Sequence, residues 1–152
     1  MAETAQRTGA VNTVIFHAAG SMEGRNTDVF GFMENLKEKA PQESLGGPAA
    51  VLGAGGAARA ICASLQEEGV GEIRIVNRSE KKARDLAQEI TQAAGPRAAH
   101  VPWRDREAAL AGISLLVNGT PLGMSGSPPL DLPLGLLPEA AVVYDIVYIP
   151  QA

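Results

Sequence analysis

A glycine-rich segment at 51–60, VLGAGGAARA, carries the clearest chemical pattern in the sequence. Gly53, Gly55 and Ala58 form a Gly-x-Gly-x-x-Ala pattern directly after a run of apolar residues. The first glycine allows a tight turn, the second lets the backbone approach a pyrophosphate, and the small alanine allows the helix to pack closely on the strand. Free N–H groups at the start of that helix then face the anion. We therefore predict a dinucleotide site here. The alternative is that the glycines only form a tight turn.

A basic residue follows the second apolar run, where the ribose of a bound dinucleotide is usually recognised. Sites that prefer NAD place an acidic residue about 20 residues after the glycines, whereas this sequence has Asn77-Arg78-Ser79. The guanidinium of Arg78 offers paired donors and a full positive charge, which suit a 2′-phosphate. We therefore predict NADP rather than NAD as the cofactor. The alternatives are that Arg78 is a solvated residue at a strand end and that Lys81 or Lys82 is a solvated charge.

From Pro48 onward, short β-like runs alternate with longer helix-like runs, which is typical of βαβ units with a parallel sheet. The expected strands lie at 49–53, 72–77, 97–103, 113–118 and 141–148, and the expected helices at 58–69, 80–95 and 105–112. Thr120 and Met124 lie in a Gly/Pro-rich loop after the fourth strand, at the carboxyl edge where open α/β sheets bind ligands; packing is the alternative role for Met124. We predict a Rossmann-like, doubly wound α/β domain with strand order 3-2-1-4-5.

The first 47 residues have a different pattern. Residues 10–28 indicate two short strands around an Ala-Gly-Ser turn, and residues 29–41 indicate a helix that Pro41 ends. Residues 42–47 form a linker into the first buried strand. Because a two-stranded hairpin is only marginally stable in water, we expect this hairpin-plus-helix extension to pack on another surface.

Composition restricts the class of protein. The chain has 152 residues, a net charge of -4, 45% hydrophobic residues and one cysteine. No run approaches the ~20 apolar residues of a membrane helix, and Cys62 has no disulfide partner, so we expect a globular protein of the cytoplasm. The mildly acidic charge and the 4% of aromatic residues argue against nucleic-acid binding. His17 and His100 lack Cys, Asp or Glu at ligand spacing, so we predict no metal site.

Several separate motifs occur together along the chain. They are Gly9-Ala10-Val11-Asn12-Thr13, Gly24-x-Asn26-Thr27-Asp28-x-x-Gly31-Phe32, the glycine-rich segment, Asn77-Arg78-Ser79-x-x-Lys82, Asn118-x-Thr120-Pro121-x-Gly123-Met124 and Tyr144-Asp145-x-x-Tyr148-x-Pro150. In order and spacing, this set resembles the NADP-dependent shikimate dehydrogenases over nearly the whole chain. The resemblance implies reversible hydride transfer between NADP(H) and the 3-dehydroshikimate/shikimate pair, a step in chorismate and aromatic amino-acid biosynthesis.

The resemblance also implies roles for individual residues. It assigns Asn12 to the substrate hydroxyls, Asp28 to substrate binding and to proton transfer together with a lysine, and Tyr148 to the substrate carboxylate region. Taken alone, Asp28 would instead be read as a helix N-cap. Ile146 occupies the position that lines the nicotinamide pocket. The other implied cofactor-binding residues are Gly53, Ala54, Gly55, Gly56, Ala57, Asn77, Arg78, Ser79, Lys82, Asn118, Thr120 and Met124.

The chain also departs from the family pattern. The family begins with a substrate domain that carries a Ser-x-Ser pair and the catalytic lysine, and it ends with a helical segment bearing a glutamine; this sequence has neither. We therefore expect a piece of the enzyme in which 1–27 is a remnant hairpin of the substrate domain, 28–47 is a connecting helix and linker, and 48–152 is an NADP-binding domain truncated at its C-terminus. Without the lysine, we expect almost no turnover and at least partial cofactor binding.

Two other functions stay open. The chain is alternatively a non-catalytic NADP-binding module, or it belongs to a quinate/shikimate dehydrogenase of broader substrate range. The small-molecule substrate is then shikimate, 3-dehydroshikimate or quinate. The unpaired edges of the sheet and of the hairpin further suggest a homodimer or self-association through strand edges.

Overall fold

A computed structural model describes residues 3–92 and 97–148. Its main feature is a parallel five-stranded sheet with the order β5-β4-β3-β6-β7. The strands are β3 (Ala49–Leu52), β4 (Glu72–Asn77), β5 (Arg97–Pro102), β6 (Leu115–Asn118) and β7 (Val142–Asp145). Since β3 is the first strand of the sheet along the chain, this is the predicted order 3-2-1-4-5, and the Rossmann-like α/β fold is confirmed.

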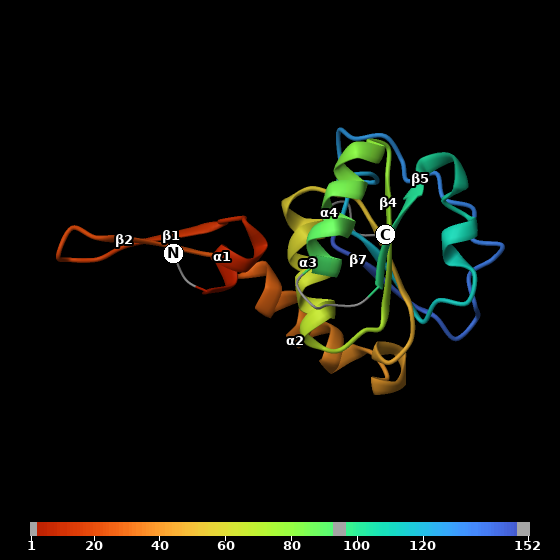
Figure 1. The fold of residues 1–152 in the computed structure, drawn as a ribbon, viewed down its shortest axis with the longest axis horizontal. Helices are drawn as coiled ribbons and strands as arrows, with labels where there is room; N and C mark the ends of the chain where they lie inside the picture. The colour runs from red at the N-terminus through yellow and green to blue at the C-terminus, as the bar shows by residue number, and fades with distance from the viewer. Residues whose placement is uncertain (1–2, 93–96, 149–152) are drawn as a thin grey trace.

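Both faces of the central strands are covered, because all four residues of β3 and of β6 are buried. Ala49 and Val51 belong to one core cluster together with residues of three helices, while Ala50 and Leu52 belong to a second cluster on the opposite face. Figure 1 shows the helices on one side of the sheet and the segment after β5 on the other. Continuous apolar runs such as AAVL therefore fit a strand buried on both faces.

The crossover helices on the first face are α3 (Gly56–Glu67) and α4 (Glu80–Gln92). The helix expected at 58–69 thus begins two residues earlier, at Gly56. It ends where Gly69 adopts a φ of +80° and the Val70 amide donates to Leu65, a Schellman arrangement that favours glycine. The expected end of the second helix, at 95, lies outside the described residues.

The helix expected at 105–112 is wrong. The chain instead forms two single 3₁₀ turns, η2 (Trp103–Asp105) and η3 (Ala108–Leu110). Eight residues are too few to propagate an α-helix without strong packing. The Arg106 guanidinium also donates to the Trp103 carbonyl oxygen and to Asp131, which holds the first turn closed.

The N-terminal segment contains the predicted hairpin and helix, and Figure 1 shows the hairpin extending away from the layered body. Its strands are β1 (Thr13–Phe16) and β2 (Met22–Arg25), and it is followed by α2 (Asp28–Lys39) and the 3₁₀ turn η1 (Gln42–Leu45). Helix α2 packs on α3 through a helical stripe that includes Val29, Phe32 and Leu36. One helix, α1 (Glu3–Thr8), was not predicted from the sequence.

Candidate functional site

The glycine-rich segment forms a tight turn between β3 and α3. Gly53 has a φ of +106°, and a Cβ at that position would lie 3.0 Å from the carbonyl oxygen of Gly119. Gly55 differs, because a Cβ there would meet nothing within 4 Å. Gly53 therefore serves the turn itself, whereas Gly55 leaves open space in front of the first N–H groups of α3. This is the space that a pyrophosphate would need.

The residues after β4 leave two positive charges free. Arg78 and Lys82 are exposed, and neither side chain has a hydrogen bond or an ion pair with the part of the chain that the structure describes. Lys81, in contrast, pairs with Asp85 one helical turn later at 2.7 Å. Ser79 directly precedes α4, and its hydroxyl lies 3.5 Å from the Lys82 backbone amide. Arg78 and Lys82 are thus the cations available to a ligand phosphate here.

Two cavities adjoin each other at the carboxyl edge of the sheet. The first, of about 440 Å³, has Asp28 and Phe32 of α2 on one wall and residues of β7 on the other. The second, of about 330 Å³, is lined by the loop after β6, including Thr120 and Met124. Ala57, Ile146 and Tyr148 line both cavities. Together the cavities form a cleft that leads from Asp28 past Ala57, in the first turn of α3, to Met124.

The apolar wall of the first cavity is held by an aromatic contact between α2 and β7. The rings of Phe32 and Tyr144 meet edge to face, with centroids 5.0 Å apart. Burial raises the pKa of the Tyr144 hydroxyl, so this group stays neutral and adds no charge to the cleft. This contact fixes the helix that carries Asp28 against the edge of the sheet.

Asn12 and Asp28, which are 16 residues apart, are in direct contact. The Asn12 amide donates to an Asp28 carboxylate oxygen at 2.6 Å, and the Asn12 oxygen accepts from the Thr27 backbone amide at 3.0 Å. The N-cap position of α2 is Thr27 and Asp28 is the first helical residue, so the reading of Asp28 as an N-cap is wrong. The Asp28 carboxylate is instead bonded to Asn12, and Asp28 lines the first cavity.

Asn118, predicted to bind the cofactor, is 3% exposed and has its polar groups bonded within the protein. Its amide group donates to Asp145 and Leu122, and its oxygen accepts from the Thr120 backbone amide and hydroxyl. Ile146 and Thr120, in contrast, line the cleft. The structure therefore brings most of the predicted residues to one edge of the sheet but gives Asn118 an internal role.

Two polar residues of this region were missed as site residues. Asn26 is buried and links α1 to α2, because its amide donates to Thr8 and its oxygen accepts from the Asp28 backbone amide. Asp145 lines the first cavity and accepts from Asn118. Both residues lie inside the motifs quoted above, but their types alone do not separate a structural amide or carboxylate from a ligand-binding one.

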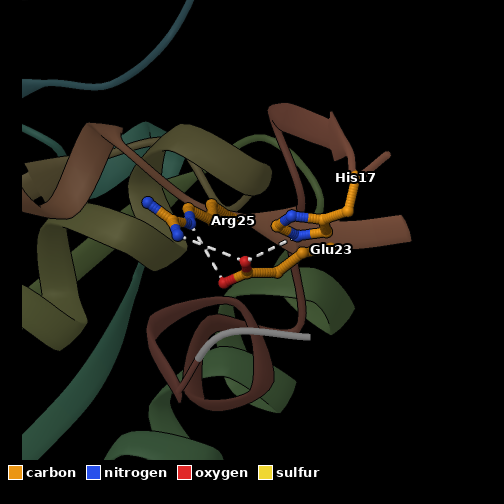
Figure 2. A network of polar contacts seen from close by, with 3 residues as sticks. All are labelled: His17, Glu23 and Arg25. Carbon is orange, nitrogen blue, oxygen red and sulfur yellow. Dashed lines mark hydrogen bonds and ion pairs between the residues drawn. The ribbon is translucent and has the colours of Figure 1, made fainter. Parts of the chain in front are cut away.

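The hairpin next to Asn12 carries a small polar network (Figure 2). Glu23 accepts two hydrogen bonds from Arg25, at 3.0 and 3.2 Å, and lies 3.4 Å from Nε2 of His17. The Arg25 guanidinium holds the pKa of Glu23 below its ordinary value. This network lies on the β1–β2 hairpin and lines neither cavity of the cleft.

The described residues offer neither a cluster of metal ligands nor a membrane-spanning helix. No three side chains of His, Cys, Asp or Glu within 3–92 and 97–148 gather in a way that would hold a metal ion. Over the same ranges, no helix is both long and apolar enough to cross a bilayer.

The chain is similar to known proteins of one enzyme family. Residues 35–118 match the family model described as Shikimate / quinate 5-dehydrogenase. A relative from Paramagnetospirillum magneticum, named shikimate dehydrogenase (NADP(+)), is 52% identical over 147 residues, which make up 96% of this chain and 52% of that protein. The chain therefore spans about half the length of the curated relatives that it matches.

Solved structures are similar over the same extent. The Thermus thermophilus shikimate 5-dehydrogenase in complex with NADP(H) and shikimate is 41% identical with a TM-score of 0.78, over 98% of this chain and 52% of that one. A quinate dehydrogenase from Corynebacterium glutamicum in complex with NAD is 34% identical with a TM-score of 0.83, over 98% of this chain and 53% of that one. The two neighbours thus share this fold and differ in the cofactor that they hold.

Proposed function

The chain belongs to the Shikimate / quinate 5-dehydrogenase family, and we propose that it provides the NADP(H) site and part of the substrate site of a shikimate dehydrogenase. The reaction is reversible hydride transfer between NADP(H) and the 3-dehydroshikimate/shikimate pair. The observation that carries this proposal is the continuous cleft, which has a carboxylate at one end and the loop after β6 at the other.

The residues present fit a dinucleotide. The open space at Gly55 and the free N–H groups of α3 suit the pyrophosphate, and the second cavity, between Ala57, Met124 and Ile146, suits the nicotinamide. When bound, the nicotinamide carries the hydride. The protein residues then orient the ring toward the first cavity, where Asp28 and Tyr148 would bind the substrate.

Proton transfer needs more than Asp28. Reduction of a ketone leaves negative charge on oxygen, which a positioned acid must neutralise. Three of the four lysines of the chain pair with carboxylates elsewhere: Lys37 with Glu68, Lys39 with Glu38 and Lys81 with Asp85. The fourth, Lys82, lies on α4 beyond β4. We therefore expect this chain alone to bind the cofactor but to turn over almost no substrate.

NADP is favoured over NAD by the free guanidinium of Arg78 and by the lack of an acid at the end of β4. The second candidate function is that of a quinate dehydrogenase that uses NAD, and it is favoured by the likeness to the NAD complex from Corynebacterium. A third is NADP binding without catalysis, which would leave Asp28 as a residue that only fixes the hairpin through Asn12.

We propose that the chain spans parts of two domains. Residues 1–27 would belong to the substrate domain and 48–152 to the cofactor domain, with 28–47 connecting them. We also propose a cytoplasmic location, which the biosynthetic role of the proposed reaction and the free, buried thiol of Cys62 support. Self-association is also part of the proposal, and it rests on the exposed hairpin.

The proposal is tested by calorimetric titration of the purified chain with NADP⁺ and with NAD⁺, followed by an assay of shikimate and quinate oxidation. We expect binding of NADP⁺, at least tenfold weaker binding of NAD⁺, and negligible oxidation of either substrate. Tighter binding of NAD⁺ would favour the quinate alternative. Robust oxidation of shikimate would contradict the predicted need for a lysine, and binding of neither cofactor would contradict the cofactor assignment.

A further inference from the structure

The last residues of β6 and β7 form a hydrogen-bonded pair at the carboxyl edge of the sheet. Asn118 and Asp145 are direct neighbours in the parallel register, and Nδ2 of Asn118 donates to Oδ1 of Asp145 at 2.9 Å. The Ile146 amide also donates to the Asn118 carbonyl oxygen, at 3.3 Å. The two strands are therefore joined by side-chain and by backbone hydrogen bonds at the point where each strand ends.

Both polar groups of the Asn118 side chain, the amide NH₂ and the oxygen, form hydrogen bonds within the protein. An asparagine amide offers two N–H donors and an oxygen with two lone pairs. The second donor reaches the Leu122 carbonyl oxygen at 3.3 Å, and the oxygen accepts from the backbone amide and the hydroxyl of Thr120, at 3.1 and 2.7 Å. Asn118 thus shapes the first turn of the loop that lines the second cavity.

Asp145 shapes the segment after β7 by a hydrogen bond of the same kind. The oxygen that accepts from Asn118 also accepts from the Val147 backbone amide at 2.9 Å. This bond turns the chain directly after the strand, so that Ile146, Val147 and Tyr148 line the second cavity. One carboxylate oxygen therefore connects the loop after β6 to the segment after β7.

We propose that Asp145 is a positioning residue that, through Asn118, holds these two segments at the spacing a nicotinamide ring requires. This inference rests on the proposed function for the identity of the ligand. It gives Asp145 an indirect role, through Thr120 and Ile146, and it requires the acceptor oxygen rather than the negative charge. Asn118 contributes by the same hydrogen bonds, and its direct contact with the cofactor stays a prediction.

The test compares Asp145→Ala with Asp145→Asn in the full chain. Both hydrogen bonds of the carboxylate end on the same oxygen, Oδ1. The carbonyl oxygen of an asparagine can therefore accept both, and Asp145→Asn removes only the charge. Amide hydrogen exchange by NMR is measured without cofactor at Thr120 and Val147, and the affinity for NADP⁺ is measured by calorimetry. Thermal unfolding shows whether each variant is folded.

We expect Asp145→Ala to speed exchange at the Thr120 and Val147 amides and to weaken NADP⁺ binding, each by about tenfold, the factor carried by the loss of one hydrogen bond. Asp145→Asn should stay within about twofold of the wild type in both. Unchanged exchange at Thr120 in Asp145→Ala would overturn the inference. Equal losses in the two variants would overturn it as well, because the charge would then be the cause.

The two readouts separate this inference from the proposed function. Hydrogen exchange reports on the connection between the two segments whether or not a cofactor binds. If the wild-type chain fails to bind NADP⁺ while Asp145→Ala still speeds exchange at Thr120, the proposed function is contradicted and the coupling of the two segments is supported. If NADP⁺ binds and Asp145→Ala binds it with unchanged affinity, the positioning role is contradicted and the proposed function stands.

Discussion

Arg78 and Lys82 have no partner among the described residues, and this freedom predicts how the chain discriminates between cofactors. Hydrogen bonds from a charged donor contribute about 1.5–3 kcal/mol each. We therefore expect Arg78→Ala to weaken NADP⁺ binding by roughly 10- to 100-fold and to leave NAD⁺ binding unchanged, because NAD⁺ has no 2′-phosphate. Calorimetric titration of the variant with both cofactors measures the difference.

Lys81 and Lys82 offer a matched comparison on the same helix. Lys82 has no ion pair within the described chain, whereas Lys81 is paired with Asp85. Lys82→Ala should weaken NADP⁺ binding, by a smaller factor than Arg78→Ala because an ammonium is a single point of charge. Lys81→Ala should have little effect. A loss of affinity for NAD⁺ as large as that for NADP⁺, in any of these variants, would refute 2′-phosphate recognition.

Cys62 provides a prediction about reactivity and pH. The residue is fully buried, and burial raises its pKa to about 12. The thiolate is the reactive form, so we expect no reaction with a disulfide reagent at pH 8 in the folded chain and one reacting thiol after denaturation. An exposed thiol has a pKa near 9.0. Between about pH 9 and pH 12, ionisation of Cys62 therefore stabilises only the unfolded chain. Stability should therefore fall over this range as the pH rises. Immediate labelling of the folded chain would contradict the assignment.

At the scale of elements, the two glycines of the β3–α3 turn should respond differently to the same change. Gly53→Ala places a Cβ at a φ of +106° and 3.0 Å from the Gly119 carbonyl oxygen, so it should lower the free energy of unfolding by about 1–3 kcal/mol. Gly55→Ala meets open space and should cost less than about 1 kcal/mol, the effect of a poorer N-cap.

For cofactor binding, we expect the larger effect from Gly55→Ala rather than from Gly53→Ala. A methyl group at Gly55 occupies the space proposed for the pyrophosphate, so Gly55→Ala should abolish measurable NADP⁺ binding while the chain stays folded. Chemical unfolding and calorimetry on both variants provide the two measurements. Normal NADP⁺ binding by Gly55→Ala would show that the pyrophosphate does not bind in front of Gly55.

Elements with a strong local pattern could be predicted from the sequence. The bounds of β4 agree residue for residue, and the order of the sheet follows from the βαβ rhythm. Helix α1 was missed, because its six residues have no apolar stripe and its place depends on Asn26 and on α3. The turns η2 and η3 depend on bonds from Arg106 to distant carbonyl groups, which no local pattern encodes.

The same distinction holds for the site. The glycine-rich turn could be predicted because its function is a backbone conformation that few sequences provide. The internal role of Asn118 could not, since it depends on Asp145, 27 residues later, and on the register of β6 with β7. The contact of Asn12 with Asp28 likewise depends on how the hairpin meets α2. Contacts between segments are set by packing, and sequence spacing does not fix them.

At the scale of the whole molecule, the projecting hairpin has two unlike faces (Figure 1). Cross-strand pairing places Ile15 and Glu23 on one face, with the network of Figure 2, and Phe16 and Met22 on the other. Phe16 is 75% exposed and Met22 is 69% exposed. A two-stranded sheet also leaves both of its edges unpaired. Apolar side chains and free edges thus occur together on the part of the chain that lies farthest from the main sheet.

This arrangement predicts self-association that depends on concentration, which size-exclusion chromatography with light scattering can measure. Phe16→Ser combined with Met22→Ser should shift the chain toward the monomer, because burying each side chain against a second copy would gain about 1.5–3 kcal/mol. Leu134→Ser is the control: Leu134 is 54% exposed but lies between β6 and β7, away from the hairpin. A monomeric wild type at every concentration would contradict the prediction. Because Phe16 and Met22 are mostly exposed, replacing them should leave the fold intact. An equal shift toward the monomer in Leu134→Ser would mean that exposed apolar side chains in general, and not this face of the hairpin, make the contact.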